Sequence, residues 1–371
     1  MELTLVCPCL LGVEGLVAQE LRDLGCENVR AENGRVFCTG DMRTAARINI
    51  GSRCAERVLI SLKTFRALSF EELFQGVKSI PWEDFLRKED AFPVSGSSLS
   101  SRLHSIPDCQ SIIKKAIVER LKEKYHVSWF EETGPLHRVR FLIMKDQVSV
   151  MIDTSGEGLH KRGYRKNSAE APIKETLAAA IAKLVRVRYD GTVIDPFCGS
   201  GTLLIESLML AKNMAPGTRR HFAAENWQGV PRRIWSDERE RAIAAIRKDA
   251  PVQAFGFDID PAAVELTLEN AGKAGVRPHI HAEVRDIRDF QAETEYGCVL
   301  ANPPYGERLL DREQAAGLYQ VMGRLFTARR GWSYAVITPE PDFEKLFGRK
   351  ADRRRKLYNG MISCQLYQYF K

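Results

Sequence analysis

The stretch that decides the fold is Val193-Ile194-Asp195-Pro196-Phe197-Cys198-Gly199-Ser200-Gly201-Thr202. It passes from a short apolar strand through a glycine turn into a helix expected over residues 202–212. In parallel α/β sheets, ligands bind at the carboxyl ends of the strands, where glycines let the backbone approach them. The spacing departs from the dinucleotide fingerprint, because Leu204 stands at the position of the third glycine. Two glycines alone also suit a plain tight turn, so the function depends on the residues that follow.

Strand-like runs and helix patterns alternate from about residue 172 onwards. Runs at 193–195, 255–258, 298–301 and 333–337 precede helices expected over 202–212, 262–274, 314–329 and 343–346. This alternation is typical of a doubly wound, mostly parallel sheet. Asn359-Gly360, between two further strand-like runs, indicates an antiparallel hairpin at one edge of that sheet.

Carboxylates follow two of these strands. Asp258 ends the run Gly256-Phe257-Asp258, where a carboxylate can accept hydrogen bonds from ribose hydroxyls. Asp260-Pro261 is interpreted as the cap and first residue of the next helix. Asp286-Ile287 follows the run 280–284, and Asp286 suits either an exocyclic amine such as adenine N6 or the cap of its own turn.

Asn302-Pro303-Pro304-Tyr305 follows the run 298–301 and is the most specific signal in the chain. The two prolines fix the backbone and remove backbone donors. The Asn302 side-chain oxygen and the Pro303 carbonyl can then accept both hydrogen bonds from one planar NH₂ group, while Tyr305 stacks on a base. A structural turn alone does not need this combination.

The N-terminal half has a different pattern. Residues 1–48 mix strand-like runs (3–9 and 36–38) with helix patterns (13–24 and 42–48), which suggests a small α+β unit. Residues 49–155 continue in the same style, with amphipathic helices expected over 70–77 and 112–125 and strands over 127–130 and 139–144. Residues 95–101 are expected to form a Ser/Gly-rich loop.

Composition limits the class of protein. A chain of 371 residues with 44% hydrophobic and 28% charged residues is long enough for two or three folded domains. No apolar run approaches the ~20 residues of a membrane helix, and the N-terminus lacks the basic stretch of a signal peptide. The nine cysteines show no C-x-x-C spacing, so we expect reduced thiols, no metal site and a cytoplasmic location.

The positive charge is concentrated in the second half. The net charge is +7, with −1 in residues 1–160 and +8 in the remainder, which suggests a polyanionic partner. The basic stretches 161–166 and 349–356 suit either phosphate contacts or a solvated surface, and the first also suits a domain interface. Residues 213–236 contain arginines and tryptophans that suit either unpaired RNA or, as we favour, a packed excursion.

Together these motifs resemble the class I S-adenosylmethionine-dependent methyltransferases of the N-P-P-Y type. The resemblance covers residues 172–371 and extends further to His160-Lys161-Arg162-Gly163-Tyr164-Arg165, to the run 171–177 and to Gly306-Glu307-Arg308. With these residues the chain resembles the THUMP-domain RNA guanine-N2 methyltransferases with a UPF0020-type methylase domain, most of all those acting on bacterial 23S rRNA. Residues 100–121 are similar to the later part of a THUMP domain.

The resemblance implies an α/β fold in which a Rossmann-like class I methyltransferase domain follows ferredoxin-like and THUMP domains. The implied division is a ferredoxin-like segment (1–48), a THUMP domain (49–155), a linker (156–171) and a methyltransferase domain (172–371). The implied catalytic residues are Asn302, Pro303, Pro304 and Tyr305. The implied cofactor contacts come from Asp195, Phe197, Cys198, Gly199, Gly201, Thr202, Asp258, Ile259, Asp286 and Ile287. The implied RNA contacts come from Lys161, Arg162, Arg165 and Lys166.

The implied reaction transfers a methyl group from S-adenosylmethionine to a guanosine N2 amine, with 23S rRNA as the favoured target, leaving S-adenosylhomocysteine. Base extrusion exposes the amine, and positioning supplies much of the rate. No membrane and no obligate protein partner are expected. Four alternatives remain: a tRNA guanosine as target, DNA adenine-N6 methylation, methylation of a protein glutamine, and a catalytically silent RNA-binding factor.

Overall fold

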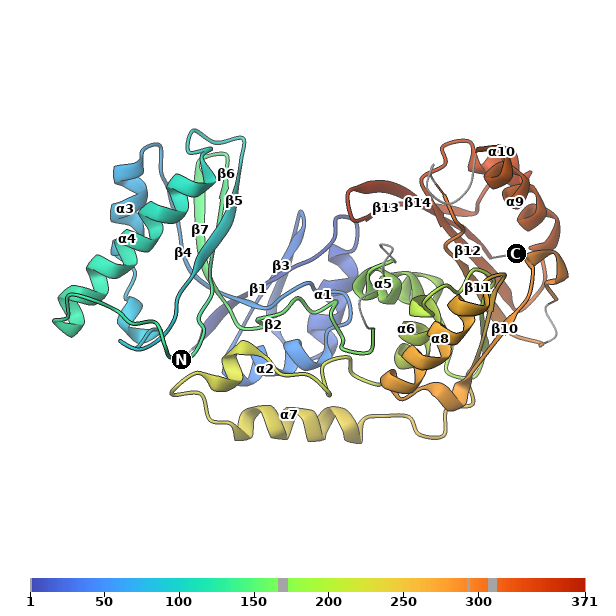
Figure 1. Cartoon of the computed structure of the whole chain (residues 1–371), viewed down its shortest axis with the longest axis horizontal. Helices are drawn as coiled ribbons and strands as arrows, with labels where there is room; N and C mark the ends of the chain where they lie inside the picture. The colour runs from blue at the N-terminus through green and yellow to red at the C-terminus, as the bar shows by residue number, and fades with distance from the viewer. Residues whose placement is uncertain (1, 166–172, 292–293, 306–311, 371) are drawn as a thin grey trace.

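The computed structural model describes residues 2–165, 173–291, 294–305 and 312–370, which form two seven-stranded sheets (Figure 1). The first has the strand order β2-β3-β1-β4-β7-β6-β5 and the second β10-β9-β8-β11-β12-β14-β13. The strands of the first sheet are β1 (Leu3–Pro8), β2 (Glu27–Glu32), β3 (Arg35–Gly40), β4 (Leu59–Arg66), β5 (Val94–Leu99), β6 (Val139–Met144) and β7 (Gln147–Asp153). Those of the second are β8 (Thr192–Asp195), β9 (Gln253–Asp258), β10 (Ile280–Val284), β11 (Gly297–Ala301), β12 (Trp332–Thr338), β13 (Arg353–Asn359) and β14 (Ile362–Tyr369).

The first sheet runs without a break through both N-terminal units. β1 pairs with β4 through Leu5↔Ile60 and Val6↔Leu59, and β4 pairs in turn with β7. The α-helices of this half are α1 (Glu14–Asp23), α2 (Met42–Gly51), α3 (Phe70–Lys78) and α4 (Ile106–Tyr125). The expected boundary after residue 48 falls inside α2, and the two units share one sheet.

Two expectations for this half are wrong. Residues 95–101 are not all loop, because 94–99 form β5, which pairs in parallel with β6. The small residues are needed there, since a Cβ at Gly96 would collide with the Phe141 carbonyl oxygen. No strand forms over 127–130: α4 is followed by the left-handed His126 (φ +52°), and the next strand is β6.

The second sheet confirms the expected doubly wound arrangement. β10, β9, β8, β11 and β12 are parallel, and β14 and β13 form the antiparallel hairpin at the edge. Because the parallel strands share one direction, Asp195, Asp258 and Ala301 all end at the same edge of the sheet. The α-helices of this half are α5 (Glu175–Val185), α6 (Thr202–Ala211), α7 (Arg233–Ala244), α8 (Pro261–Ala274), α9 (Arg312–Leu325) and α10 (Phe343–Phe347). The short 3₁₀ turns of the chain are η1 (Trp82–Asp84), η2 (Ala223–Asn226), η3 (Arg277–His279) and η4 (Ile287–Asp289).

Helix α7 ties the two halves together along one side of the molecule (Figure 1). It packs against α2, where Arg47 donates two hydrogen bonds to the Glu238 carboxylate, at 3.0 and 3.1 Å. Nearby, Lys183 of α5 pairs with the buried Glu20 of α1 at 3.0 Å. These charged contacts are shielded from water, so they resist salt better than exposed pairs do.

Within the described residues, no helix is long and apolar enough to span a membrane. The same residues contain no group of three His, Cys, Asp or Glu side chains placed to hold a metal ion. All nine cysteines are free thiols, and Cys26 alone among them is more than slightly exposed.

Candidate active site

The glycine turn between β8 and α6 is held in a shape that other residues would not adopt. Asp195 is 1% exposed, and its carboxylate accepts a hydrogen bond from Phe197 N at 3.0 Å. Gly199 and Gly201 have φ values of +52° and +75°, and a Cβ at Gly201 would approach Thr267 Cγ2 to 2.9 Å. Glycine is therefore required at position 201 by both conformation and space.

Two buried polar side chains of α8 support this turn from below. Thr267 Oγ1 donates to Gly199 O at 2.9 Å, and Asn270 Nδ2 donates to Ser200 O at 2.9 Å. Neither side chain is exposed. Sequence reasoning missed both, although polar residues three apart on the buried face of a helix are an available signal.

The carboxylate of Asp258 connects the second strand to the glycine turn. Its Oδ2 accepts from Gly199 N at 3.0 Å, and its Oδ1 accepts from Asp260 N at 3.1 Å. Asp260 caps α8 by accepting from Ala262 N at 2.9 Å, which confirms the interpretation of Asp260-Pro261 as a helix start. Next to Asp258, the apolar Ile259 is 72% exposed at the strand end.

The Asn302-Pro303-Pro304-Tyr305 segment follows β11 at the same edge. Asn302 Oδ1 is buried and has no hydrogen-bond partner among the described residues. A buried acceptor without a partner is costly, so it marks a place where a ligand donor fits. The Tyr305 hydroxyl accepts a hydrogen bond from Asn359 Nδ2 at 2.9 Å, which ties this segment to the β13–β14 hairpin. Burial raises the pKa of Tyr305, so its hydroxyl stays protonated.

Comparison with known proteins agrees with this geometry. The family model described as "RMKL-like, methyltransferase domain" matches residues 162–368. The chain belongs to this family. A ferredoxin-like domain named for RlmL matches residues 4–59 of this methyltransferase, and a THUMP domain matches residues 67–153. Both lie in the first sheet, as the resemblance implied.

Several relatives are similar over nearly the whole of this chain. A Bacillus subtilis (strain 168) protein, provisionally named as the RNA methyltransferase YpsC, is 41% identical over 99% of this chain and 96% of its own. The large-subunit ribosomal RNA methyltransferase K/L of Methylococcus capsulatus is 35% identical over 96% of this chain, which spans 50% of that relative's length. The crystal structure of SMU.472, described as a methyltransferase complexed with SAH, has a TM-score of 0.94 and 42% identity, covering 100% of this chain and 98% of that one.

The chain is therefore an S-adenosylmethionine-dependent methyltransferase. The residues present fit that cofactor, which supplies a methyl group on an activated sulfonium. The Asp258 carboxylate keeps lone pairs for ribose hydroxyls beyond the two backbone donors it already accepts. The exposed Ile259 offers an apolar surface for adenine. The positive-φ turn at 199–201 leaves room for close backbone approach.

The other residues that were expected to contact the cofactor are less accessible. Thr202 and Cys198 are buried, and Cys198 Sγ accepts from Thr267 Oγ1 at 3.5 Å. Asp286 accepts from Arg288 N at 2.8 Å, so it caps its own turn, the alternative left open by the sequence. The Ile287 side chain is 4% exposed and belongs to the apolar core. Any contact of Ile287 with adenine would therefore use its backbone.

Burial raises the pKa of Asp195 to about 8, and the neighbouring Asp258 carboxylate adds to this rise. Between about pH 4 and pH 8, Asp195 keeps its proton in the folded chain but has lost it in the unfolded chain, so stability falls as pH rises through this range. We expect Asp195→Asn to raise the free energy of unfolding by a few kcal/mol at pH 8.5 and to leave it nearly unchanged at pH 4. Urea unfolding without cofactor at both pH values tests this, with the exposed Asp342→Asn as control. An equal effect at the two pH values would contradict it.

The predicted RNA contacts of the 161–166 stretch need correction. Arg162 is buried: it donates to Leu159 O and Arg53 O, at 2.6 and 2.5 Å, and pairs with Glu206 at 3.5 Å. The Tyr164 hydroxyl also donates to Glu206, at 3.0 Å. We call Arg53, Arg162, Tyr164 and Glu206 the interdomain seam. A guanidinium enclosed in this way cannot reach RNA, and the described part of the expected linker, residues 156–165, forms a packed junction.

The other residues of the stretch vary in position. Arg165 donates to Ile173 O at 2.9 Å and faces Glu175 at 3.6 Å, so it too serves the protein interior. The Lys161 side chain is 63% exposed and pairs with Glu157, and it remains available to RNA. Lys166 lies outside the described residues.

Both remaining basic segments contribute contacts within the protein. In 213–236, Trp227 stacks on His137 of the THUMP domain with ring centroids 4.4 Å apart, and Trp235 stacks on Phe222 at 5.3 Å. The packed interpretation is thus confirmed. In 349–356, Arg349 donates to Phe326 O and Arg355 to Gly12 O.

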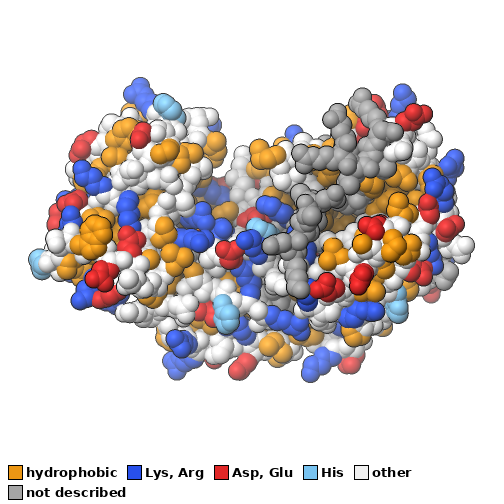
Figure 2. Space-filling view, viewed as in Figure 1, with side chains coloured by type: hydrophobic (Ala, Val, Ile, Leu, Met, Phe, Trp, Pro, Cys, Tyr) orange, Lys and Arg blue, Asp and Glu red, His pale blue; other side chains and the backbone are white. Residues whose placement is uncertain are grey.

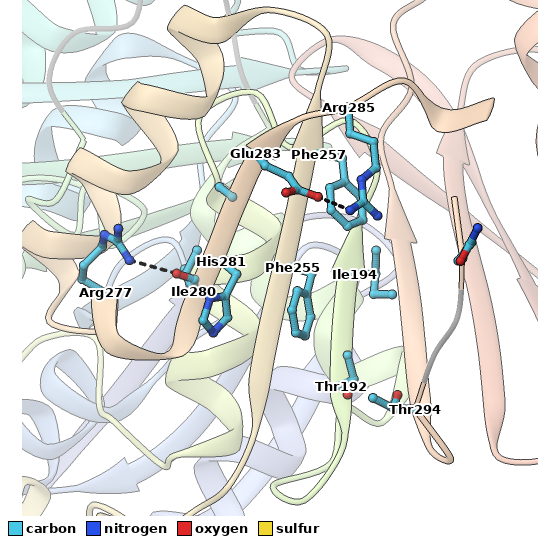
Figure 3. Close-up of a pocket in the computed structure, with 12 residues that line it drawn as sticks. Thr192, Ile194, Phe255, Phe257, Arg277, Ile280, His281, Glu283, Arg285 and Thr294 are labelled. Atoms are coloured by element: carbon cyan, nitrogen blue, oxygen red, sulfur yellow. Dashed lines mark hydrogen bonds and ion pairs between the residues drawn. The ribbon is translucent and has the colours of Figure 1, made fainter. Parts of the chain in front are cut away.

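A cavity of about 460 Å³ lies on the face of the sheet over β8, β9 and β10 (Figure 3). Phe255 and His281 stand side by side in it, with ring centroids 5.2 Å apart. No expected catalytic or cofactor residue lines it. We therefore look for the site at the strand ends and not in this cavity.

Proposed function

We propose that this methyltransferase transfers a methyl group to the exocyclic N2 amine of a guanosine in 23S rRNA. The observation that carries the proposal is the buried, unpartnered Oδ1 of Asn302, which follows β11 at the strand-end edge shared with Asp195 and Asp258. An amine with two N–H groups supplies the donor that this oxygen lacks. The large-subunit rRNA named for the K/L relative supports the choice of RNA.

The segment Asn302-Pro303-Pro304-Tyr305 activates the amine by fixing its position relative to the methyl group. An aromatic amine is a poor nucleophile, because its lone pair is delocalised into the ring. Acceptance of its two N–H groups by Asn302 Oδ1 and the Pro303 carbonyl localises that lone pair and aims it at the methyl group. Both acceptors also stabilise the positive charge that develops on nitrogen. Tyr305, held through Asn359, offers its ring face to the base.

A group of arginines supports an RNA substrate. Arg57, Arg138, Arg140 and Arg220, which we call the arginine cluster, gather where β4, β6 and β7 meet the junction residues 156–161. Arg57 and Arg140 share the carboxylate of Asp153, at 2.6 and 3.4 Å. Figure 2 shows Lys and Arg side chains gathered in the hollow between the two lobes.

The cluster carries more positive charge than its surroundings neutralise. Burial, together with repulsion from Arg162 and Arg57, lowers the pKa of Arg220 to about 10. Burial and the nearby Arg57 likewise lower the pKa of Arg140, whose Nε is buried with no hydrogen-bond partner in the described parts of the chain. A phosphate bound against the exposed part of the cluster would relieve this repulsion.

We expect Arg140→Gln to weaken RNA binding about tenfold and to reduce the slope of log affinity against log salt by about one. Asp153 keeps Arg57 as its partner, so the fold should survive. Filter binding of rRNA at several salt concentrations measures both quantities. Arg188→Gln is the matched control, because Arg188 is exposed near the opposite, amino end of β8. An unchanged salt slope in Arg140→Gln would contradict a phosphate contact.

The decisive experiment uses labelled S-adenosylmethionine and total RNA from a strain lacking the enzyme, followed by nucleoside analysis. Label in N2-methylguanosine of the large rRNA supports the proposal. Label in N2-methylguanosine of tRNA keeps the chemistry and changes the target. Label that enters adenine of DNA or a protein glutamine, offered in parallel, overturns it. Cofactor binding without transfer to any acceptor would favour a silent RNA-binding factor.

A further inference from the structure

The turn of the β13–β14 hairpin stands beyond the carboxyl ends of the parallel strands. β14 runs antiparallel to β12 with Thr338 opposite Gln365, so its first residue, Ile362, lies three residues past the end of β12. At ~3.4 Å per residue the turn projects roughly 10 Å above the edge that carries Asn302. The hairpin turn therefore lies above the candidate catalytic segment.

The turn is fixed in place rather than loose. Its central residues are Gly360, with φ +63°, and Met361, between the paired Asn359 and Ile362. The sequence signal placed the turn one residue early, because Asn359 is the last strand residue and uses its side chain to hold Tyr305. The Cys364 thiol also contacts the Tyr305 hydroxyl.

The other end of the hairpin is attached to the N-terminal half. Arg355 Nη1 donates to Gly12 O at 3.0 Å, and a Cβ at Gly12 would approach Lys356 O to 2.8 Å. Figure 1 shows the hairpin on the side of the methyltransferase domain that faces the first sheet. The hairpin thus borders the hollow between the lobes.

The hairpin tip carries an apolar side chain that is not packed into the protein core. Met361 is 98% exposed and Ile362 is 47% exposed. The chemistry of the hairpin suits a polyanion, because residues 353–371 include no Asp or Glu and the exposed Arg353, Arg354 and Lys356 precede the turn. Isolated exposed apolar residues are common on proteins, but this one is rigidly connected to the tyrosine that would stack on the target base.

We propose that Met361 is the wedge that enters the RNA stack at the position left by the extruded guanosine. The proposal rests on the proposed function, since it needs an RNA base to be drawn into the site. Unstacking a base is costly, and apolar side chains, including Met, fill the gap in other nucleic-acid complexes. Tyr305 would hold the base outside the stack while Met361 prevents its return.

The test compares Met361→Ala with wild type on two synthetic RNAs that carry the mapped guanosine, one paired and one opposite an abasic site. We expect kcat/KM to fall about tenfold or more on the paired RNA and less than about twofold where extrusion is cheap. Met361→Leu should retain activity on both. With 2-aminopurine at the target position, the fluorescence gain on binding should be smaller for Met361→Ala. Ile243→Ala, which removes a 50% exposed apolar side chain from α7, is the control.

The outcomes separate the two proposals. Wild-type activity with equal losses for Met361→Ala on both RNAs, or with no loss, overturns the wedge and leaves the proposed function intact. A wild-type enzyme that methylates no RNA overturns both.

Discussion

Asn302→Ala is expected to lower kcat for methyl transfer by about 10²–10³-fold while the affinity for S-adenosylmethionine stays within about twofold. The substitution removes the buried oxygen that has no hydrogen-bond partner among the described residues. Without it, the amine keeps its lone pair in the ring and loses one of the two bonds that aim it. The loss should therefore appear in the chemical step.

Single-turnover methylation of rRNA and calorimetric titration of the cofactor measure the two quantities separately. Tyr305→Phe is an informative comparison, because it keeps the ring and loses only the hydroxyl bonded to Asn359. It should cost less than about tenfold, since the stacking surface remains. Transfer by Asn302→Ala within tenfold of wild type would show that Asn302 does not accept from the amine.

Arg162→Met is expected to destabilise the protein by about 3–5 kcal/mol, because it leaves the Glu206 carboxylate buried without its cation. Glu206 has no exposed surface, and within the described ranges its Oε2 has no hydrogen-bond partner. The Arg162 guanidinium also satisfies the carbonyls of Leu159 and Arg53, which would lose their donors. The loss should appear in urea or thermal unfolding of the cofactor-free enzyme.

Two variants make this result specific. Lys161→Met, at the neighbouring exposed position, should change stability by less than about 1 kcal/mol. Arg162→Met combined with Glu206→Gln should recover much of the loss, because no uncompensated charge remains. If Arg162→Met is as stable as Lys161→Met, the interdomain seam does not depend on this ion pair.

The sequence was sufficient for the second sheet because its signals are local. A strand, a glycine turn and a helix follow one another in 193–212, and the structure differs there by one residue at the helix end. The first sheet was harder, because pairing partners decide it. Residues 95–99 are a strand on account of Phe141, more than forty positions away.

The site was predictable for the same reason only in part. Asn302 and Asp258 belong to short motifs, but Thr267, Asn270 and Asn359 act through contacts between segments 54 to 70 residues apart. For Arg162, the sequence predicted a contact with RNA that the structure does not allow. Its neighbours in sequence are basic, yet its surroundings in space are two carbonyls and a carboxylate. Charge patterning cannot reveal which of several cations folds inward.

The continuous first sheet has a consequence for how a target is selected. Independent domains joined by a tether would change their separation, but β1–β4 pairing and the interdomain seam hold the arginine cluster at a set distance from Asn302. On the proposed function, this fixed distance determines which guanosine reaches the active site. The enzyme would methylate the guanosine that lies at this fixed distance from a phosphate bound by the arginine cluster. Adding or removing nucleotides between that phosphate and the guanosine should therefore abolish methylation. Changing the identity of those nucleotides should have little effect.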